Sequence, residues 1–259
     1  MAAAFYQRRP TTIRVNPLRT TDEALTQTLQ QEGHTVTAGP WPHCLLVMFN
    51  GNPAASKAFH AGQFHVQGLA SQFAALCCDA RPGMRVLDLC AGSGCIGLAL
   101  ASQAPQAHVV LGEFSDGALR ICRQNTRRNA LTGRVIPMTV NALERPDRAL
   151  GEFHCIVSNP PYIPHGDIPG LDHSVKDYEP HLALDGGEDG LDFYRAISEK
   201  WKAALAPGGR LYFEVGIGQA DAVLRIMRAQ GFGDIQVVKD HNDIPRVVFG
   251  TLCGEVYSE

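Results

Sequence analysis

From Gly83 onward, short β-rich runs alternate regularly with stretches of helical pattern. This alternation predicts a mainly parallel sheet whose two faces are covered by helices. Ligands bind such sheets at the carboxyl ends of the strands, so the segments that follow the strands are the candidates for function. The expected strands are 84–89, 108–113, 134–140, 153–158, 209–215, 234–239 and 246–251, and the expected helices are 95–104, 115–130, 189–206 and 219–230.

The first 80 residues have a different pattern. In chain order, cap residues, glycines and apolar runs predict a strand at 12–18, a helix at 21–33, a strand at 44–49, a loop at 51–63 and a helix at 69–80. Arg81-Pro82-Gly83 separates the two parts. We therefore expect a small α/β appendage for substrate recognition at 1–80 and the main domain at 81–259.

Composition and targeting signals exclude several classes of protein. A net charge of −3 with 19% charged residues gives no overall basic excess of the kind that predicts nucleic-acid binding. The 8 cysteines are scattered and form no CxxC pair, which argues against a zinc ribbon and a disulfide framework. Residues 1–10 lack the apolar core of a signal peptide, and no apolar run approaches the roughly 18 residues of a membrane span. We expect a cytoplasmic protein without membrane contact.

Glycines follow the first expected strand of the main sheet, in the sequence LDLCAGSGCIG (87–97). Such a loop lets the backbone approach a ligand at a helix N-terminus. Its GxGxxG spacing, with Glu113 about 20 residues after Gly92, would suit a nicotinamide dinucleotide. Asp88 favours S-adenosylmethionine instead, because this carboxylate would face the positively charged methionine part while Glu113 bound both ribose hydroxyls. A purely structural role of the glycines in the turn is the remaining interpretation.

The strand at 153–158 ends at the sequence Asn159-Pro160-Pro161-Tyr162. Prolines cannot extend a central strand, and two in succession fix the backbone at this point. The side-chain oxygen of Asn159 and the backbone carbonyl of Pro160 could accept both protons of a planar NH2 group, which would point the nitrogen lone pair at a methyl donor. Tyr162 could stack on the same group. This corner predicts methyl transfer to an amide or an aromatic amine.

Four segments of the chain together have a specific resemblance. They are NPPYI (159–163), YEPHLALDGGEDGLDFYRAI (178–197), FEVGIGQ (213–219) and PRVVFG (245–250). They resemble the release-factor glutamine methyltransferases, the HemK/PrmC family, and the resemblance covers residues 83–252. It implies a class I methyltransferase fold, with a Rossmann-like seven-stranded sheet whose last strand is reversed, and S-adenosylmethionine as the cofactor. It also implies methylation of the glutamine side-chain amide in the GGQ tripeptide of peptide chain release factors.

By this resemblance, two groups of residues form the site. The catalytic and substrate-binding residues would be Asn159, Pro160, Pro161, Tyr162 and Glu179. The cofactor-binding residues would be Asp88, Cys90, Ala91, Gly92, Gly94, Glu113, Phe114, Asn141, Ala142 and Asn159. Asn141 departs from the family pattern, in which an acidic or hydroxyl residue usually holds the adenine amino group. No metal is expected, because His173, His181 and Asp185 have no recognised ligand spacing.

The N-terminal region resembles a different family. IRVNPLRTT (13–21), EGHTVTAGPW (32–41) and GQFHVQGLASQ (62–72) are similar to the region before the catalytic domain in bacterial RNA cytosine-5 methyltransferases of the RsmB/NSUN type. A natural fusion, a recombined or designed chimera, or an unusual subfamily would each produce this combination. Contact with RNA through the N-terminal region is one expectation that follows from it.

Three alternatives to amide methylation follow from the same sequence features. Cytosine-5 methylation needs a cysteine after the proline of the catalytic corner, and Tyr162 stands there instead. Methylation of a base amino group in RNA or DNA would use the same Asn-Pro-Pro-Tyr corner. The third alternative is a module that binds the cofactor without transferring a methyl group. The motifs taken together favour the amide methyltransferase.

Overall fold

The computed structural model describes residues 10–78, 80–172, 180–240 and 242–253. The chain forms two compact units that divide between Gln72 and Phe73, whereas the sequence placed the boundary at 81–83. The difference arises at helix α3 (Leu69–Cys77), because Ala74 in its second half is buried in the core of the C-terminal unit. Within the described residues, no helix is long and apolar enough to cross a membrane.

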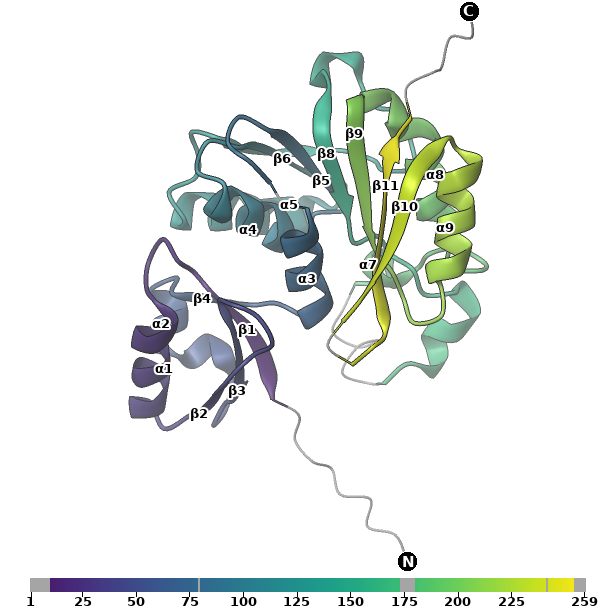
Figure 1. Ribbon diagram of the computed structural model, residues 1–259. Helices are drawn as coiled ribbons and strands as arrows, with labels where there is room; N and C mark the ends of the chain where they lie inside the picture. Colours follow the sequence, from purple (N-terminus) through teal and green to yellow (C-terminus); the bar gives the residue numbers. More distant parts are fainter. Residues whose placement is uncertain (1–9, 79, 173–179, 241, 254–259) are drawn as a thin grey trace, which may run out of the picture. The chain divides into compact units, whose positions relative to one another are not determined.

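The N-terminal unit is an antiparallel sheet accompanied by helices α1 and α2, drawn in purple and blue in Figure 1. Its strand order is β2-β3-β1-β4. Its core contains the buried side chains of Ile13, Leu25, Val47 and Phe64. The elements are β1 (Thr11–Val15), α1 (Asp22–Gln31), β2 (Thr35–Ala38), β3 (Cys44–Met48), the 3-10 turn η1 (Pro53–Ala55), α2 (Lys57–His60) and β4 (Phe64–Val66).

The sequence predicted β1, α1 and β3 but not the other elements of this unit. The loop expected at 51–63 is wrong, because it contains η1 and α2. The Ser56 hydroxyl starts α2 by accepting hydrogen bonds from the backbone N–H groups of Ala58 and Phe59. Strand β2 was missed although its four residues, Thr-Val-Thr-Ala, alternate between polar and apolar, because so short a run is a weak signal and the strand lies mostly exposed.

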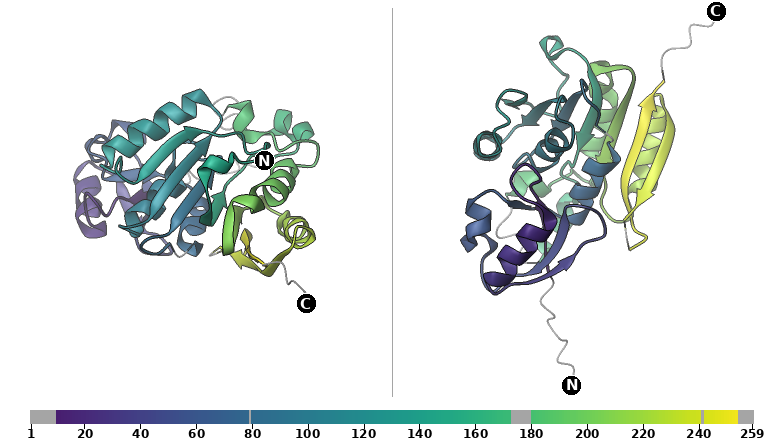
Figure 2. Two further views of the ribbon diagram at one scale, coloured as in Figure 1. Left: turned by 90° about the horizontal axis from the view of Figure 1, so that it is seen from above. Right: turned by 60° about the vertical axis from the view of Figure 1, so that its left-hand side comes forward.

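The C-terminal unit contains the expected seven-stranded sheet, with strand order β10-β11-β9-β8-β5-β6-β7. Five neighbouring strands, β9, β8, β5, β6 and β7, are parallel to one another, while β11 is antiparallel to both of its neighbours, β9 and β10. The predicted reversal of the last strand is therefore confirmed. Figure 2 shows β10 and β11 as the yellow pair at one edge. The strands are β5 (Arg85–Leu89), β6 (His108–Glu113), β7 (Val135–Thr139), β8 (Phe153–Ser158), β9 (Leu205–Glu214), β10 (Phe232–Lys239) and β11 (Pro245–Leu252).

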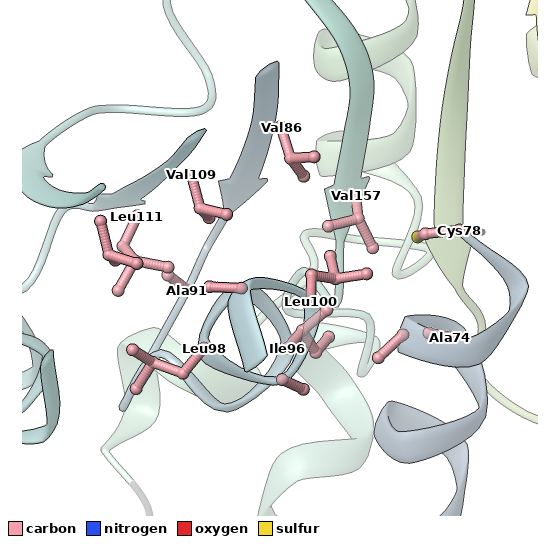
Figure 3. Close-up of a cluster of buried hydrophobic side chains, with 14 of the residues drawn as sticks. Ala74, Cys78, Val86, Ala91, Ile96, Leu98, Leu100, Val109, Leu111 and Val157 are labelled. Carbon is pink, nitrogen blue, oxygen red and sulfur yellow. The ribbon is translucent and has the colours of Figure 1, made fainter. Parts of the chain in front are cut away.

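Helices cover both faces of this sheet, and successive residues of the central strand β5 pack into the cores on opposite faces. Val86 of β5 packs into a cluster with α3, α4 and α5, and Figure 3 shows Ile96 and Leu100 of α4 in that cluster. Leu87 of β5 packs on the opposite side with α8, η4 and α9, where Trp201 is fully buried. The remaining elements are α4 (Cys95–Gln103), α5 (Asp116–Arg128), η2 (Arg148–Leu150), η3 (His165–Gly170), α7 (His181–Leu184), α8 (Asp192–Lys200), η4 (Trp201–Ala204) and α9 (Ala220–Ala229).

The chain changes direction across the sheet between β5 and β8. From β5 it proceeds outward to β6 and β7, and it then returns to place β8 on the other side of β5. Neighbouring parallel strands whose connections leave in opposite directions create a crevice at their carboxyl ends. Leu89 and Ser158 are register partners at that end, and the Ser158 hydroxyl donates to the Leu89 carbonyl over 2.8 Å. The glycine loop and the Asn-Pro-Pro-Tyr corner begin at these two residues.

Candidate active site

The glycine loop leaves β5 with a backbone that few other residues could adopt. Cys90 has a φ of 58° although it carries a side chain, and Gly92 and Gly94 have φ values of 58° and 83°. A Cβ on Gly97 would lie 2.3 Å from the Cδ2 atom of Leu111, so this glycine lets α4 pack against the sheet. A Cβ on Gly92 would meet no atom within 4 Å in the described part of the chain. The start of α4 therefore packs closely against β6, while the backbone at Gly92 is open to a ligand.

Asp88 is fully buried one residue before the end of β5. Its Oδ2 atom accepts a hydrogen bond from the backbone N–H of Gly97 over 2.8 Å, while its Oδ1 atom is buried without a hydrogen-bond partner among the described residues. The pKa of this carboxyl is raised from 3.8 to about 7, chiefly by burial; the hydrogen bond from Gly97 opposes this rise and the nearby charge of Glu113 adds to it. A buried acceptor of this kind suits a polar or cationic ligand group.

Glu113 ends β6 and binds the two loops beside it. Its Oε2 atom accepts from the N–H of Gly92 and its Oε1 atom from the N–H of Ser115, each over 2.7 Å. Each carboxylate oxygen can accept a second hydrogen bond, so ribose hydroxyls could be added to these contacts. Phe114, the next residue, has 54% of its side chain exposed and offers an apolar surface for a flat ring.

Asn141 and Ala142 follow β7; the side chain of Asn141 makes its contacts within the turn, whereas the backbone of Ala142 contacts η4. The Asn141 side chain accepts from the N–H of Leu143 over 3.0 Å and donates to Glu144 over 3.1 Å. The carbonyl of Ala142 accepts from the indole N–H of Trp201 over 3.0 Å. The side-chain oxygen of Asn141 is therefore engaged in shaping the turn, and a role in holding an adenine amino group stays a prediction.

The Asn-Pro-Pro-Tyr corner follows directly from β8. Pro160 and Pro161 are buried, whereas Asn159 and Tyr162 are half-buried. The corner begins beside the residue that starts the glycine loop, because Ser158 and Leu89 are paired across β5 and β8. The sequence thus predicted correctly that both motifs lie at the carboxyl ends of strands, and the structure shows that these two strands are neighbours.

A short parallel bridge fixes the chain after the corner. The N–H of Ile163 donates to the carbonyl of Leu184 over 3.0 Å, and the N–H of Gly186 donates back to the carbonyl of Ile163 over 2.9 Å. A Cβ on Gly186 would lie 2.8 Å from the Cα of Tyr162, so glycine is required at this contact. The LALDGG part of the EPHLALDGG segment therefore supports the corner from one side.

Gln219 supports the corner from the other side. Its amide nitrogen donates to the carbonyl of Tyr162 over 2.9 Å and to the carbonyl of Gly190 over 3.3 Å. Its amide oxygen accepts from the N–H of Gly216 over 3.1 Å. The hydroxyl of the buried Tyr194 donates to the carbonyl of Glu214 over 3.1 Å, on the same segment. The NPPYI motif, the segment around Gly190 and the FEVGIGQ segment, which are distant in sequence, therefore meet at the side chain of Gln219.

Comparison with known proteins finds relatives with similar sequences. The model for the methyltransferase small domain matches residues 60–170. Over 169 residues, 64% of this chain and 57% of the relative, the sequence is 47% identical to the release factor glutamine methyltransferase of Geobacter sulfurreducens. Over 170 residues, 66% of this chain and 60% of the relative, it is 42% identical to the enzyme of the same name from Clostridium acetobutylicum. Over about two thirds of its length, this chain is therefore similar in sequence to release factor glutamine methyltransferases.

The chain spans less than two thirds of the length of these two relatives. A solved structure with a similar fold is that of NSun6 from Pyrococcus horikoshii with SFG, at a TM-score of 0.73 and 15% identity, covering 95% of this chain and 91% of that one. At this identity the likeness concerns the fold alone, and it agrees with the class I methyltransferase fold expected from the sequence. The origin of the N-terminal unit, as a fusion, a chimera or a subfamily trait, stays a hypothesis.

Some of the expected residues lie outside the described part of the chain, and the structure adds two residues that were not expected. Glu179, predicted to bind substrate, lies outside the described residues, as does His173. His181 and Asp185 are described, and the structure brings them together with His165, which the sequence analysis did not single out. Gln219 was also not singled out, although it ends the FEVGIGQ segment. Its position in a segment typical of the family was the signal that could have identified it.

Two cysteines near the candidate site bear on the cytosine-5 alternative. Burial raises the pKa of Cys90 to about 12, and Cys155 is buried in the middle of β8. A thiolate nucleophile needs the opposite environment, one that is partly exposed and lowers the pKa. Neither cysteine fits the chemistry of a cytosine-5 methyltransferase.

Proposed function

We propose that this protein is an S-adenosylmethionine-dependent N-methyltransferase that methylates the glutamine side-chain amide of the GGQ motif in peptide chain release factors. The observation that carries the proposal is the placement of the Asn-Pro-Pro-Tyr corner beside the glycine loop, with Gln219 and the 184–187 segment holding the corner in place. The names of the relatives from Geobacter sulfurreducens and Clostridium acetobutylicum support the choice of substrate.

The residues around the glycine loop fit the proposed cofactor. The open space above Gly92 allows a ligand to approach the backbone, and the unpartnered Oδ1 atom of Asp88 gives a buried acceptor for the charged methionine part. Glu113 would accept from the ribose hydroxyls, and the exposed ring of Phe114 would cover the adenine. Cys90, Ala91, Gly94, Asn141, Ala142 and Asn159 complete the proposed cofactor-binding set.

The corner residues would prepare the substrate nitrogen for transfer. An amide nitrogen is a weak nucleophile because its lone pair is delocalised into the carbonyl group. The Oδ1 atom of Asn159 and the carbonyl of Pro160 would accept one N–H each, which fixes the plane of the amide and directs the lone pair outward. When bound, S-adenosylmethionine supplies an electrophilic methyl group on its sulfonium. As the C–N bond formed, the bond between the methyl carbon and sulfur would break and its electron pair would remain on sulfur in the neutral thioether product. The methylated nitrogen would then be strongly acidic and would lose one proton to water without a strong base.

The buried prolines and Tyr162 would add orientation to this step. Since φ is fixed at both Pro160 and Pro161, the carbonyl direction is set before substrate binds, so little ordering is needed on binding. Tyr162 would stack on the amide plane. Orientation of this kind can contribute on the order of 7–11 kcal/mol to lowering a barrier. Glu179 is proposed to contact the substrate, and the N-terminal unit is proposed to recognise the release factor.

The substrate is tested by incubating the protein with labelled S-adenosylmethionine and, separately, a release factor, ribosomal RNA and DNA. We expect label in the release factor only, and peptide mass spectrometry should locate one added methyl group on the GGQ glutamine. A release factor with this glutamine replaced by alanine is the matched control and should stay unlabelled. Label in a nucleic acid alone, or calorimetric binding of the cofactor without transfer to any substrate, would contradict the proposal.

A further inference from the structure

Two histidines and an aspartate meet on the far side of the bridge that follows the catalytic corner. His165 begins η3, His181 begins α7, and Asp185 directly follows α7. The Nδ1 atom of His165 lies 2.8 Å from Oδ2 of Asp185, and the Nδ1 atom of His181 lies 3.7 Å from the same oxygen. The other carboxylate oxygen, Oδ1, accepts from the N–H of Gly187 over 3.0 Å. The backbone thus orients one oxygen of Asp185 toward two imidazoles.

The three potential ligand atoms have the spacing of an open metal site. All three lie within 4.8 Å of one another. Ligand atoms at about 2.0–2.2 Å from a tetrahedral Zn²⁺ are roughly 3.4 Å apart. The side chains of His165 and His181 are 69% and 61% exposed, so small rotations about their χ angles can bring the three atoms to that separation. His165 and Asp185 line an open hollow of about 420 Å³ with Glu188, which leaves room for water to complete the coordination.

We propose that His165, His181 and Asp185 bind a divalent transition-metal ion of the Zn²⁺ class. Two imidazole nitrogens and one carboxylate oxygen suit Zn²⁺, Co²⁺ and Ni²⁺, whereas Mg²⁺ and Ca²⁺ prefer oxygen ligands alone. Three protein ligands leave a coordination position for water. This inference is independent of the proposed methylation reaction, since none of the three side chains belongs to the proposed cofactor or substrate contacts.

The position of the ion would give it a structural effect on the active site. Ile163, which ends the NPPYI motif, is bridged to Asp185, and His165 lies two residues further along the chain. An ion held by these three residues would join the segment that leaves the corner to the segment that supports it. The bound ion therefore serves as a clamp on the loop rather than as a reactant.

The probe is Co²⁺ added to the full chain without a polyhistidine tag, because Co²⁺ bound in a tetrahedral site has visible absorption bands. We expect one equivalent to bind, Zn²⁺ to displace it, and Zn²⁺ to raise the melting temperature. His165→Ala and His181→Ala should each weaken binding by about tenfold or more, since even groups behind the direct ligands commonly contribute that much. The double variant should lose the absorption bands.

The matched control is His108→Ala, which removes an exposed histidine at the start of β6. This variant should bind Co²⁺ as the unaltered protein does. Circular dichroism of the histidine variants without metal checks that they remain folded. Absence of stoichiometric Co²⁺ and Zn²⁺ binding, or binding that the double variant retains, would overturn the proposal.

Discussion

The side-chain amide of Gln219 donates a hydrogen bond to the backbone carbonyl of Tyr162 over 2.9 Å. Tyr162 ends the catalytic corner, and Gln219 stands at the start of α9, so 57 residues separate them in the sequence. The same amide group also binds the backbone at Gly190 and Gly216. One side chain therefore connects the corner to two supporting segments and sets the direction of the corner backbone.

Replacing Gln219 by alanine should lower kcat and leave cofactor affinity nearly unchanged. The substitution removes the donor to two carbonyls and the acceptor from one N–H, and an error of about 1 Å in positioning can cost on the order of 100-fold in rate. We expect a loss of about 10–100-fold in kcat. Single-turnover kinetics and calorimetry with the cofactor measure the two quantities separately.

Arg225→Ala is the matched control for this prediction, because Arg225 is exposed on the same helix, α9. It should retain the full rate. Gln219→Glu keeps the acceptor but lacks the amide donor, so its rate should resemble that of the alanine variant. An unchanged kcat in both Gln219 variants would show that the corner is positioned without this contact.

Asp88→Asn should make the protein without cofactor more stable at pH 8 and little changed at pH 4. The folded-state pKa of Asp88 is about 7, above its ordinary value of 3.8. The folded state therefore holds this proton more tightly than the unfolded state, and stability falls as pH rises from about 4 to about 7. The resulting loss in the free energy of unfolding is complete above pH 7 and is at most about 4 kcal/mol, at about 1.36 kcal/mol per pKa unit. Urea unfolding at both pH values measures it.

The same substitution should weaken cofactor binding at pH 8, because a neutral amide replaces the carboxylate that faces the charged methionine part. We expect a loss of roughly tenfold, which corresponds to about 1.4 kcal/mol. Stability and affinity would thus change in opposite directions in one variant. Equal affinity of the variant and the unaltered protein in calorimetry would count against the assigned role of Asp88.

Gly97→Ala should destabilise the C-terminal unit although alanine is the better helix former. Alanine gains about 1 kcal/mol over glycine inside a helix. Its Cβ, however, would lie 2.3 Å from Cδ2 of the buried Leu111 and 3.0 Å from Oδ2 of Asp88. Overpacking of this kind costs about 1–3 kcal/mol, so the melting temperature should fall. Gly133→Ala, where a Cβ would meet nothing within 4 Å among the described atoms, is the control and should leave the melting temperature nearly unchanged.

The main sheet could be predicted from the sequence because its parallel strands are short apolar runs punctuated by glycine and proline. The expected ranges for β6 and β8 match the structure, and the motifs fall at strand ends for that reason. The helix expected at 189–206 ends at Lys200 instead and continues as η4, because Trp201 turns inward to be buried against the sheet. Periodicity alone does not distinguish a 3-10 turn from the last turn of an α-helix.

The contacts that hold the candidate site could not be predicted in the same way. The hydrogen bonds of Gln219 join segments that are distant in sequence, and no local pattern reports such a meeting. His165 has no motif of its own; the bridge between Ile163 and Asp185 and the hydrogen bond from the N–H of His165 to the carbonyl of Gly187 bring it to His181. Strand β4 has three residues, too few to show an alternation.

The rate of glutamine methylation by Asn159→Ala tests the central claim most directly. If the oxygens of Asn159 and Pro160 align the amide nitrogen, the variant should lose about 100-fold or more in single-turnover rate, as is typical when one oriented hydrogen-bonding group is removed from an active site. Its affinity for S-adenosylmethionine, measured by calorimetry, should stay close to that of the unaltered protein. A variant that binds the cofactor and methylates the GGQ glutamine at the original rate would contradict the account.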